Sequence, residues 1–256
     1  MIDFWIFPLS TIWGAYHLCG LPAFVLSNGS ICGESNGGYN MNVIFDMDGL
    51  MFDTEKVFIM AWDYAGEKMG IGKAGYMVYK TLGMNIVSSY NVWKEEFGDR
   101  YNQEELRKYT KEFLQNYYSG NKVPVKKGLY NLLSYLKDND CNMAVASSSP
   151  RWEVEKHLKD AGIYDYFTGI VCGDMVQNSK PNPEIYLKAC ELLGANPAEC
   201  YALEDSKNGL LSAYKAGCKT IMVPDLWQPD DEILSIIVGK YEDLDEAKDA
   251  FERFQI

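Results

Sequence analysis

Histidine is scarce in this 256-residue sequence, which contains only His17 and His157. Zinc sites and hydrolytic triads usually depend on histidine, so either kind of chemistry has little to work with here. The seven cysteines are scattered and odd in number, and no C-x-x-C motif occurs. This usage favours reduced thiols in a cytoplasmic protein over a disulfide framework or a zinc site.

Basic residues are also in deficit, because 24 Lys and Arg stand against 36 Asp and Glu and give a net charge of −12. That charge argues against a partner that is nucleic acid or an anionic membrane. It is still compatible with a small phosphorylated substrate, since a bound metal and a single lysine can reverse the local potential. Nothing in the sequence demands a partner chain, so a monomer is the default expectation.

Charge is missing altogether from residues 4–26, a stretch long enough to cross a bilayer. Proline and glycine interrupt it, however, and no Lys or Arg precedes it as a signal peptide would require. Residues 27–40 are rich in Gly, Ser and Asn and are typical of a flexible linker. We expect residues 1–40 to be a disordered or non-native extension before Met41. A membrane anchor and a packed accessory element are the alternatives.

Two aspartates follow the first strand-like run, at residues 42–46: Asp46 ends it, and Asp48 comes two residues later, before Gly49. Residues i and i+2 of a strand point to the same side, and a turn after Asp46 can bring Asp48 to the same mouth. Two carboxylates that close repel each other unless a cation lies between them. Mg²⁺ prefers such oxygen ligands. A polar turn after a buried strand is the alternative interpretation.

The hydrophobic periodicity changes along the chain. Apolar residues recur at helical spacing after residue 54, and no convincing strand occurs before residue 120. From Pro124 onward the pattern alternates, with helices predicted over 128–139, 151–161, 183–193, 209–216 and 244–254, and strands over 142–146, 169–172, 200–203 and 220–223. This alternation predicts an α/β protein with a doubly wound parallel sheet. The predicted core comprises residues 41–53 and 123–256, and a helical insert comprises residues 54–122.

Polar side chains follow several of these predicted strands, at the edge where ligands of parallel sheets bind. Ser147, Ser148 and Ser149 come after one strand, and hydroxyls at a strand-to-helix turn bind phosphate well. Lys180 precedes two prolines that restrict its backbone. Glu204 and Asp205 end another strand. Taken singly, the serines after the first of these strands could be an ordinary helix N-cap, and so could Asp205 or Ser206, while Lys180 could be a solvated surface residue.

Four motifs together resemble those of the haloacid dehalogenase superfamily. They are Asp-Met-Asp-Gly-Leu-Met-Phe-Asp-Thr-Glu from Asp46, Ser147 after an apolar strand, Lys-Pro-Asn-Pro from Lys180, and Glu-Asp-Ser-Lys-Asn-Gly from Glu204. The chain is most similar to the phosphatase and β-phosphoglucomutase branch, over residues 41–225 and more loosely in the C-terminal helix. The resemblance implies a Rossmann-like core and places an all-helical cap domain at residues 54–122.

The resemblance also implies roles for these residues. Asp46 would attack phosphorus and become an aspartyl phosphate, and Asp48 would act as general acid and base. Ser147 and Lys180 would hold the phosphoryl group. Mg²⁺ would be bound by Asp46, by the backbone carbonyl of Asp48, by Asp205 and by Glu204. The substrate would meet Thr54, Glu55, Gly83, Asn85 and Ser148, with Leu50, Phe52 and Met84 also facing the cap.

Among the activities of this branch, a phosphatase acting on a sugar phosphate or nucleotide-like monoester is favoured over a sugar phosphomutase. The mutase pattern has a histidine where this sequence has Phe58, and an arginine in the stretch that corresponds to residues 82–86, where none occurs. A dehalogenase is less consistent with Asp48. A phosphorylation receiver domain would lack the helical insert. A catalytically silent binding protein should have lost a catalytic residue, and none is lost.

Overall fold

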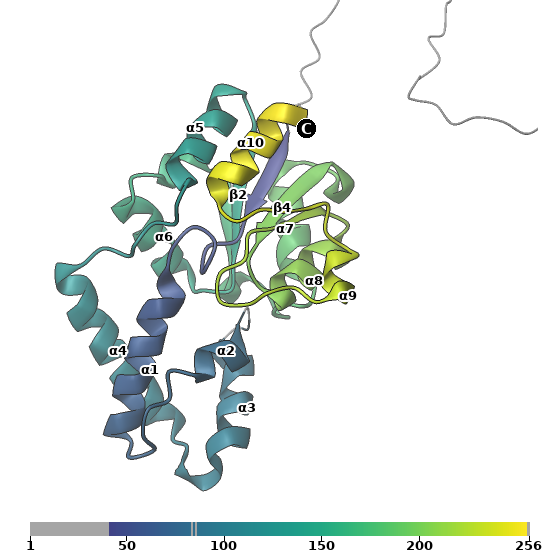
Figure 1. Cartoon of the computed structure of the whole chain (residues 1–256). Coiled ribbons are helices and arrows are strands. Elements are labelled where there is room, and N and C mark those ends of the chain that lie inside the picture. The colour runs from purple at the N-terminus through teal and green to yellow at the C-terminus, as the bar shows by residue number, and fades with distance from the viewer. Residues whose placement is uncertain (1–40, 83, 85, 255–256) are drawn as a thin grey trace, which may run out of the picture. The chain divides into compact units, whose positions relative to one another are not determined.

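The computed structural model describes residues 41–82, 84 and 86–254 (Figure 1). The predictions for residues 1–40 therefore lie outside the described residues. In the part that is described, five cysteines are all free thiols, as predicted. No helix of that part is both long and apolar enough to cross a membrane.

Six parallel strands form one sheet in the order β3-β2-β1-β4-β5-β6. The strands are β1 (Asn42–Phe45), β2 (Asn142–Ser147), β3 (Gly169–Cys172), β4 (Cys200–Glu204), β5 (Lys219–Met222) and β6 (Gly239–Lys240). β1 lies in the middle, where Asn42 is in register with Asn142 on one side and Cys200 on the other. The chain reverses its direction of winding at β1, and the crevice beyond such a point is where open α/β sheets bind ligands. The predicted parallel α/β fold is confirmed.

The side chains of β1 explain why it is central. Val43, Ile44 and Phe45 are fully buried, which is the pattern of a strand covered on both faces. Val43 and Phe45 belong to the hydrophobic cluster on one face of the sheet, and Ile44 belongs to the cluster on the other. The period-two alternation of a strand therefore supplies both halves of the core.

Helices cover both faces of the sheet (Figure 1). On the first face, α5 (Leu129–Asp138), α6 (Arg151–Asp160) and α10 (Leu244–Phe254) contribute to the cluster that holds Phe45. On the second face, α7 (Glu184–Leu193) and α8 (Lys207–Ala216) pack against Ile44. Between the two helical layers, the carboxyl ends of the parallel strands lie at one edge of the sheet.

Residues Thr54–Gly120 form a helical insert between β1 and β2, and within its described residues there is no strand. Its helices are α1 (Thr54–Lys68), α2 (Met77–Thr81), α3 (Ile86–Phe97) and α4 (Gln103–Gly120). The insert has its own hydrophobic cluster around the fully buried Trp93, whose ring meets that of Trp62 edge-on at 5.1 Å. The helices of the insert therefore bury their apolar faces mainly against one another.

The sequence did not predict the segment between β5 and α10. It contains α9 (Asp231–Leu234) and the two-residue strand β6. β6 has no apolar run, and it is held by tertiary hydrogen bonds from Val238 N to Thr220 O (2.8 Å) and from Tyr241 N to Met222 O (2.9 Å). Its strand conformation therefore comes from its neighbour and not from its own residues.

Candidate active site

Lys180 lies at the centre of the residues that follow the strands. Its Nζ donates to Asp46 Oδ1 at 2.5 Å, to Glu204 Oε1 at 2.6 Å and to the backbone oxygen of Ala146 at 3.1 Å. The residue is only 3% exposed. Three of the four predicted motifs thus meet at one ammonium group.

The charges explain why this lysine stays protonated. Burial alone would lower the pKa of the Lys180 ammonium, but the carboxylates of Asp46 and Glu204 outweigh burial and raise that pKa above its ordinary value. Burial and the neighbouring charge of Glu204 raise the pKa of Asp46, and Lys180 opposes them. The site therefore holds more negative charge than the one lysine can balance.

Asp46, Glu204 and Asp205 form a buried acidic cluster in which one oxygen from each lies within 4.8 Å of the others. Burial, followed by the charges of Glu55 and Asp46, raises the pKa of Asp205. Three clustered carboxylates with one cation are a donor set that suits a hard divalent ion such as Mg²⁺. The fold thus brings together the side chains of Asp46, Glu204 and Asp205, three of the residues predicted to bind the metal.

Gly49 makes room for this cluster. Its φ of +86° favours glycine, and a Cβ added there would lie 2.2 Å from Asp205 Oδ2. The glycine that follows Asp48 in the first motif therefore has a steric reason. It allows the turn after β1 to approach the carboxylate at the end of β4.

The side chain of Asp48 is held apart from the acidic cluster by hydroxyl groups. Thr54 Oγ1 donates to its Oδ1 at 2.8 Å, and its Oδ2 accepts from Ser149 Oγ at 2.8 Å and from Ser147 Oγ at 3.2 Å. Thr54, predicted to bind substrate, thus positions Asp48 in this arrangement. Ser149 was expected only as part of the serine run that could bind phosphate, and its contact with Asp48 was not predicted.

The serines at the end of β2 are not N-caps of α6. Pro150 occupies the N-cap position, without a side-chain capping bond, and the helix begins at Arg151. Ser147 is fully buried, and its Oγ accepts a hydrogen bond from Ser149 N at 3.0 Å. Ser148 is half-buried at the same turn. Ser206, in contrast, is the N-cap of α8 and accepts from Gly209 N at 3.2 Å.

Glu204 has two further supports that sequence reasoning missed. Tyr186, from α7, donates its hydroxyl proton to Glu204 Oε1 at 2.6 Å. Gly209, in the first turns of α8, leaves space for the carboxylate, since a Cβ there would lie 1.9 Å from Oε1 and 2.1 Å from Oε2. The glycine of the fourth motif carried a signal in the sequence, but Tyr186 did not.

The remaining predicted substrate residues are placed as follows. Glu55 is buried, its Oε2 has no hydrogen-bond partner, and its pKa is raised to about 9 by burial and then by the charges of Asp225, Asp48 and Asp46. Gly83 and Asn85 lie outside the described residues. Leu50 and Phe52 are fully buried in the cluster of the first face, against which Tyr118 of the insert also packs, and their role toward the cap stays a prediction.

Comparison with known proteins agrees with this geometry. The family model of haloacid dehalogenase-like hydrolases matches residues 43–223. YhcW of Bacillus subtilis, named as a candidate phosphatase, is 35% identical over 187 residues, which cover 72% of this chain and 83% of that protein. The phosphorylated carbohydrates phosphatase of Thermotoga maritima is 30% identical over 179 residues, covering 70% and 82%. Among solved structures, a β-phosphoglucomutase of Clostridium difficile is 26% identical with a TM-score of 0.70, covering 84% and 95%.

The matched region runs from β1 to just after β5 and contains the four motifs. In three of these motifs, the side chain of Lys180 contacts those of Asp46 and Glu204. The match spans well over half of the chain, and the curated relatives are covered over most of their length. The chain therefore belongs to the family of haloacid dehalogenase-like hydrolases, and it is an enzyme of the phosphoric monoester hydrolase class.

Proposed function

We propose that this protein is a Mg²⁺-dependent phosphatase that hydrolyses a small phosphate monoester through an aspartyl phosphate on Asp46. The observation that carries the proposal is the contact of Asp46 with Lys180 beside the acidic cluster, while Asp48 is held separately by three hydroxyls. A nucleophile and an acid–base group with distinct environments are what a two-step phosphoryl transfer needs.

The donor set fits a magnesium ion. Asp46, Asp205 and Glu204 would hold it, with the backbone carbonyl of Asp48 as a further ligand. When bound, the ion would offset the repulsion between Asp46 and the phosphate and draw charge from the phosphoryl oxygens.

The chain's own residues then divide the reaction between them. A carboxylate oxygen of Asp46 attacks phosphorus, and the bond from phosphorus to the ester oxygen breaks while Asp48 gives that oxygen a proton. Asp48 then takes a proton from a water molecule that attacks the phosphoaspartate, which releases inorganic phosphate and restores Asp46. Ser147 and Lys180 orient the phosphoryl oxygens through both steps.

In this proposal the helical insert, residues 54–122, is the cap domain. It shields the phosphoaspartate from bulk water until the alcohol has left. Its substrate contacts are assigned to Thr54, Glu55, Gly83 and Asn85, with Ser148 from the core side. The substrate class proposed is a sugar phosphate or nucleotide-like monoester, and the similarity to a phosphatase of phosphorylated carbohydrates supports the former.

A sugar phosphomutase is the second candidate, because β-phosphoglucomutases are among the similar proteins. Phe58 speaks against it. This residue stands where the mutase pattern has a histidine, and its ring packs edge-on against that of Trp62, with 5.8 Å between the ring centroids. Unlike the imidazole of a histidine, a phenyl ring cannot donate or accept a proton. A silent regulatory protein is disfavoured because every catalytic side chain is present.

The test is a screen of small phosphate monoesters with and without Mg²⁺, using protein that begins at Met41 and its Asp46→Asn variant. We expect metal-dependent release of phosphate that disappears in the variant. Isomerisation of a hexose phosphate without release would instead identify a mutase, and silence in both assays would support the regulatory alternative.

A second variant separates the two chemical steps. With p-nitrophenyl phosphate, whose leaving group needs little protonation, Asp48→Asn should form the phosphoenzyme but hydrolyse it slowly. Mass spectrometry of acid-quenched protein should then find phosphate on Asp46. An unmodified Asp46 in an active variant would contradict the covalent mechanism.

A further inference from the structure

Asn208 joins the core to the helical insert at a point far from the chain connections between them. Its Nδ2 donates a 2.9 Å hydrogen bond to the backbone oxygen of Leu82, 126 residues away. Asn208 lies in the first turn of α8, three residues after Asp205, and Leu82 follows the last residue of α2. The contact therefore runs from the acidic end of β4 to the turn that leaves α2.

The Asn208 amide and the Leu82 carbonyl are available for this hydrogen bond because neither group takes part in the hydrogen bonds of its own helix. Ser206 is the N-cap of α8, so the helix does not need the Asn208 side chain as a cap. Leu82 leaves the helical conformation, with φ of −49° and ψ of 130°. Its carbonyl therefore has no place in the hydrogen-bond ladder of α2 and is free to accept from outside.

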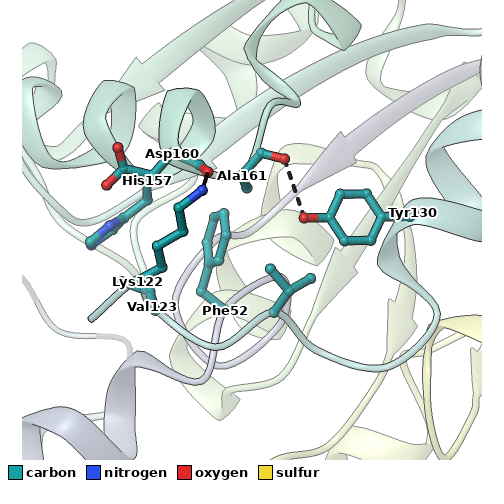
Figure 2. A pocket seen from close by; sticks show the side chains of 8 residues that line it. Phe52, Lys122, Val123, Tyr130, His157, Asp160 and Ala161 are labelled. Carbon is teal, nitrogen blue, oxygen red and sulfur yellow. Dashed lines mark hydrogen bonds between the residues drawn. The ribbon is translucent and has the colours of Figure 1, made fainter. Parts of the chain in front are cut away.

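The opposite attachment of the insert is made by two hinge segments, residues 52–53 and 121–125. They are paired with each other: Asp53 N donates to Pro124 O at 2.9 Å, and Phe52 and Val125 form an antiparallel bridge. Beside them is a cavity of about 130 Å³, around which Figure 2 shows Phe52, Lys122 and His157. Both ring nitrogens of His157 are buried without a hydrogen-bond partner.

The cavity is open to solvent, since Lys122 and Tyr130 in its lining are exposed. The hinge segments join the insert to the core through two short stretches of backbone that lie side by side. A second point of attachment is needed if the insert is to rest over the active site, and the Asn208 contact supplies one.

We propose that Asn208 is a positioning residue whose amide latches the helical insert in the arrangement that covers the catalytic carboxylates. The inference rests on the proposed function, in which the insert is the cap. The latch acts through the turn after α2, the segment to which substrate residues are assigned, and it touches neither the phosphoryl group nor the acidic cluster. Breaking it shifts the insert toward open arrangements, which weakens binding of substrates that reach the insert.

The size of the effect follows from the bond. One intramolecular hydrogen bond typically changes an equilibrium by about 2- to 10-fold. We therefore expect Asn208→Ala to raise KM by about 2- to 10-fold for the best ester of the screen, and to leave KM for acetyl phosphate, which is too small to span to the insert, unchanged. Asn208→Gln retains an amide donor and should recover part of the loss.

A matched control is available in the core. Asn131 Nδ2 donates to Asp245 Oδ1 at 2.7 Å and joins α5 to α10, so Asn131→Ala removes a comparable amide bond away from the insert. It should not alter KM for either substrate. Equal effects of the two alanine variants would mean that Asn208 acts only through general stability, and would overturn the latch.

Hydrogen exchange tests the latch without any activity. The amide of Met84 donates to Thr81 O at 3.0 Å, next to the latch acceptor. We expect peptides covering residues 77–84 to exchange about 2- to 10-fold faster in Asn208→Ala than in wild type or Asn131→Ala. Unchanged exchange would refute the latch whether or not the protein hydrolyses esters. Faster exchange in a protein without phosphatase activity would retain the latch and refute the proposed function.

Discussion

The hydroxyl of Tyr186 donates a 2.6 Å hydrogen bond to the carboxylate of Glu204, deep beneath the candidate active site. Both residues are fully buried. Glu204 Oε1 also accepts from Lys180 at 2.6 Å, so one oxygen is shared by a phenol and an ammonium. The tyrosine thus supports the acidic cluster from the second face of the sheet.

Replacing this tyrosine should destabilise the protein while leaving its fold intact. Tyr186→Phe keeps the buried ring but removes a hydrogen bond to a charged group, which is typically worth about 1.5–3 kcal/mol. We expect a loss of that size in urea unfolding of the metal-free protein, and weaker Mg²⁺ binding by calorimetry. Tyr214→Phe, at a residue of α8 that is 50% exposed, is the control and should change neither. Unchanged unfolding of Tyr186→Phe would mean that the hydroxyl contributes no net stability.

Two opposite effects on stability are expected for Gly209→Ala: a higher helix propensity and a steric clash with Glu204. Alanine should favour α8 by about 1 kcal/mol, but its Cβ would stand about 2 Å from both carboxylate oxygens of Glu204. Glu204 would have to move away from Tyr186 and Lys180, so we expect a net loss of about 2–3 kcal/mol in urea unfolding. Gly120→Ala, where a Cβ would meet nothing within 4 Å, is the control and should be neutral or slightly stabilising. A stabilised Gly209→Ala would show that the site can rearrange freely.

Glu55→Gln should stabilise the protein when metal is absent. Glu55 is 8% exposed, with Oε2 unpartnered and Asp205 nearby. Because its pKa is raised to about 9, this carboxyl group must take up a proton on folding at neutral pH, which is costly. Neutralising it should raise the melting temperature in a chelating buffer by about 2–4 °C, the shift that 1 kcal/mol produces in a protein of this size. Glu67→Gln, exposed on the same helix, should have no such effect. A lower melting temperature for Glu55→Gln would show that the charge of this carboxylate is already balanced.

Glu184 gives the loop before Lys180 a pH-dependent support. Its carboxylate accepts backbone N–H bonds from Gln177 (3.0 Å) and Asn178 (2.9 Å), and these bonds, with help from Lys188, lower its pKa to about 2. An unfolded glutamate has a pKa of about 4.3. Because the folded value is lower, the stabilisation is complete above about pH 4.3 and is lost as the pH falls toward 2.

The corresponding experiment compares Glu184→Gln with wild type by thermal unfolding at pH 7, 5 and 2.5. Wild type should be the more stable at pH 7 and 5, and the difference should shrink at pH 2.5. Glu191→Gln, at an exposed position of the same helix, should show no pH-dependent difference. A gap of equal size at all three pH values would contradict the assigned role of the carboxylate.

Features that depend on neighbouring residues in the sequence could be predicted from the sequence alone. Asp46, Ser147 and Glu204 each stand at the end of an apolar run, and parallel strands carry such residues to one edge of the sheet. The alternation of strands and helices and the helical insert were predictable for the same reason. The strand order was not predicted, because helical connections of similar length allow several orders.

The contacts that sequence reasoning missed join side chains or backbone groups of different elements. Tyr186 and Glu204 come from different elements, and nothing about a tyrosine in the first turn of α7 marks it as a partner of an acid. Asn208 and Leu82 are 126 residues apart. Ser149 stands in the same serine run as Ser147, but its bond to Asp48 depends on the turn after β1.

The position of β1 also has a consequence for how the chain folds during synthesis. Of the six described strands, β1, which Asp46 follows, leaves the ribosome first, yet its neighbours begin at Asn142 and Cys200. Pairings this remote in sequence are slow to form, and the N-terminal part of a chain emerges first. We therefore expect one side of β1 to stay unpaired until β4 has been made, so that a nascent chain which stops before residue 200 contains Asp46 but neither of the other two carboxylates of its cluster.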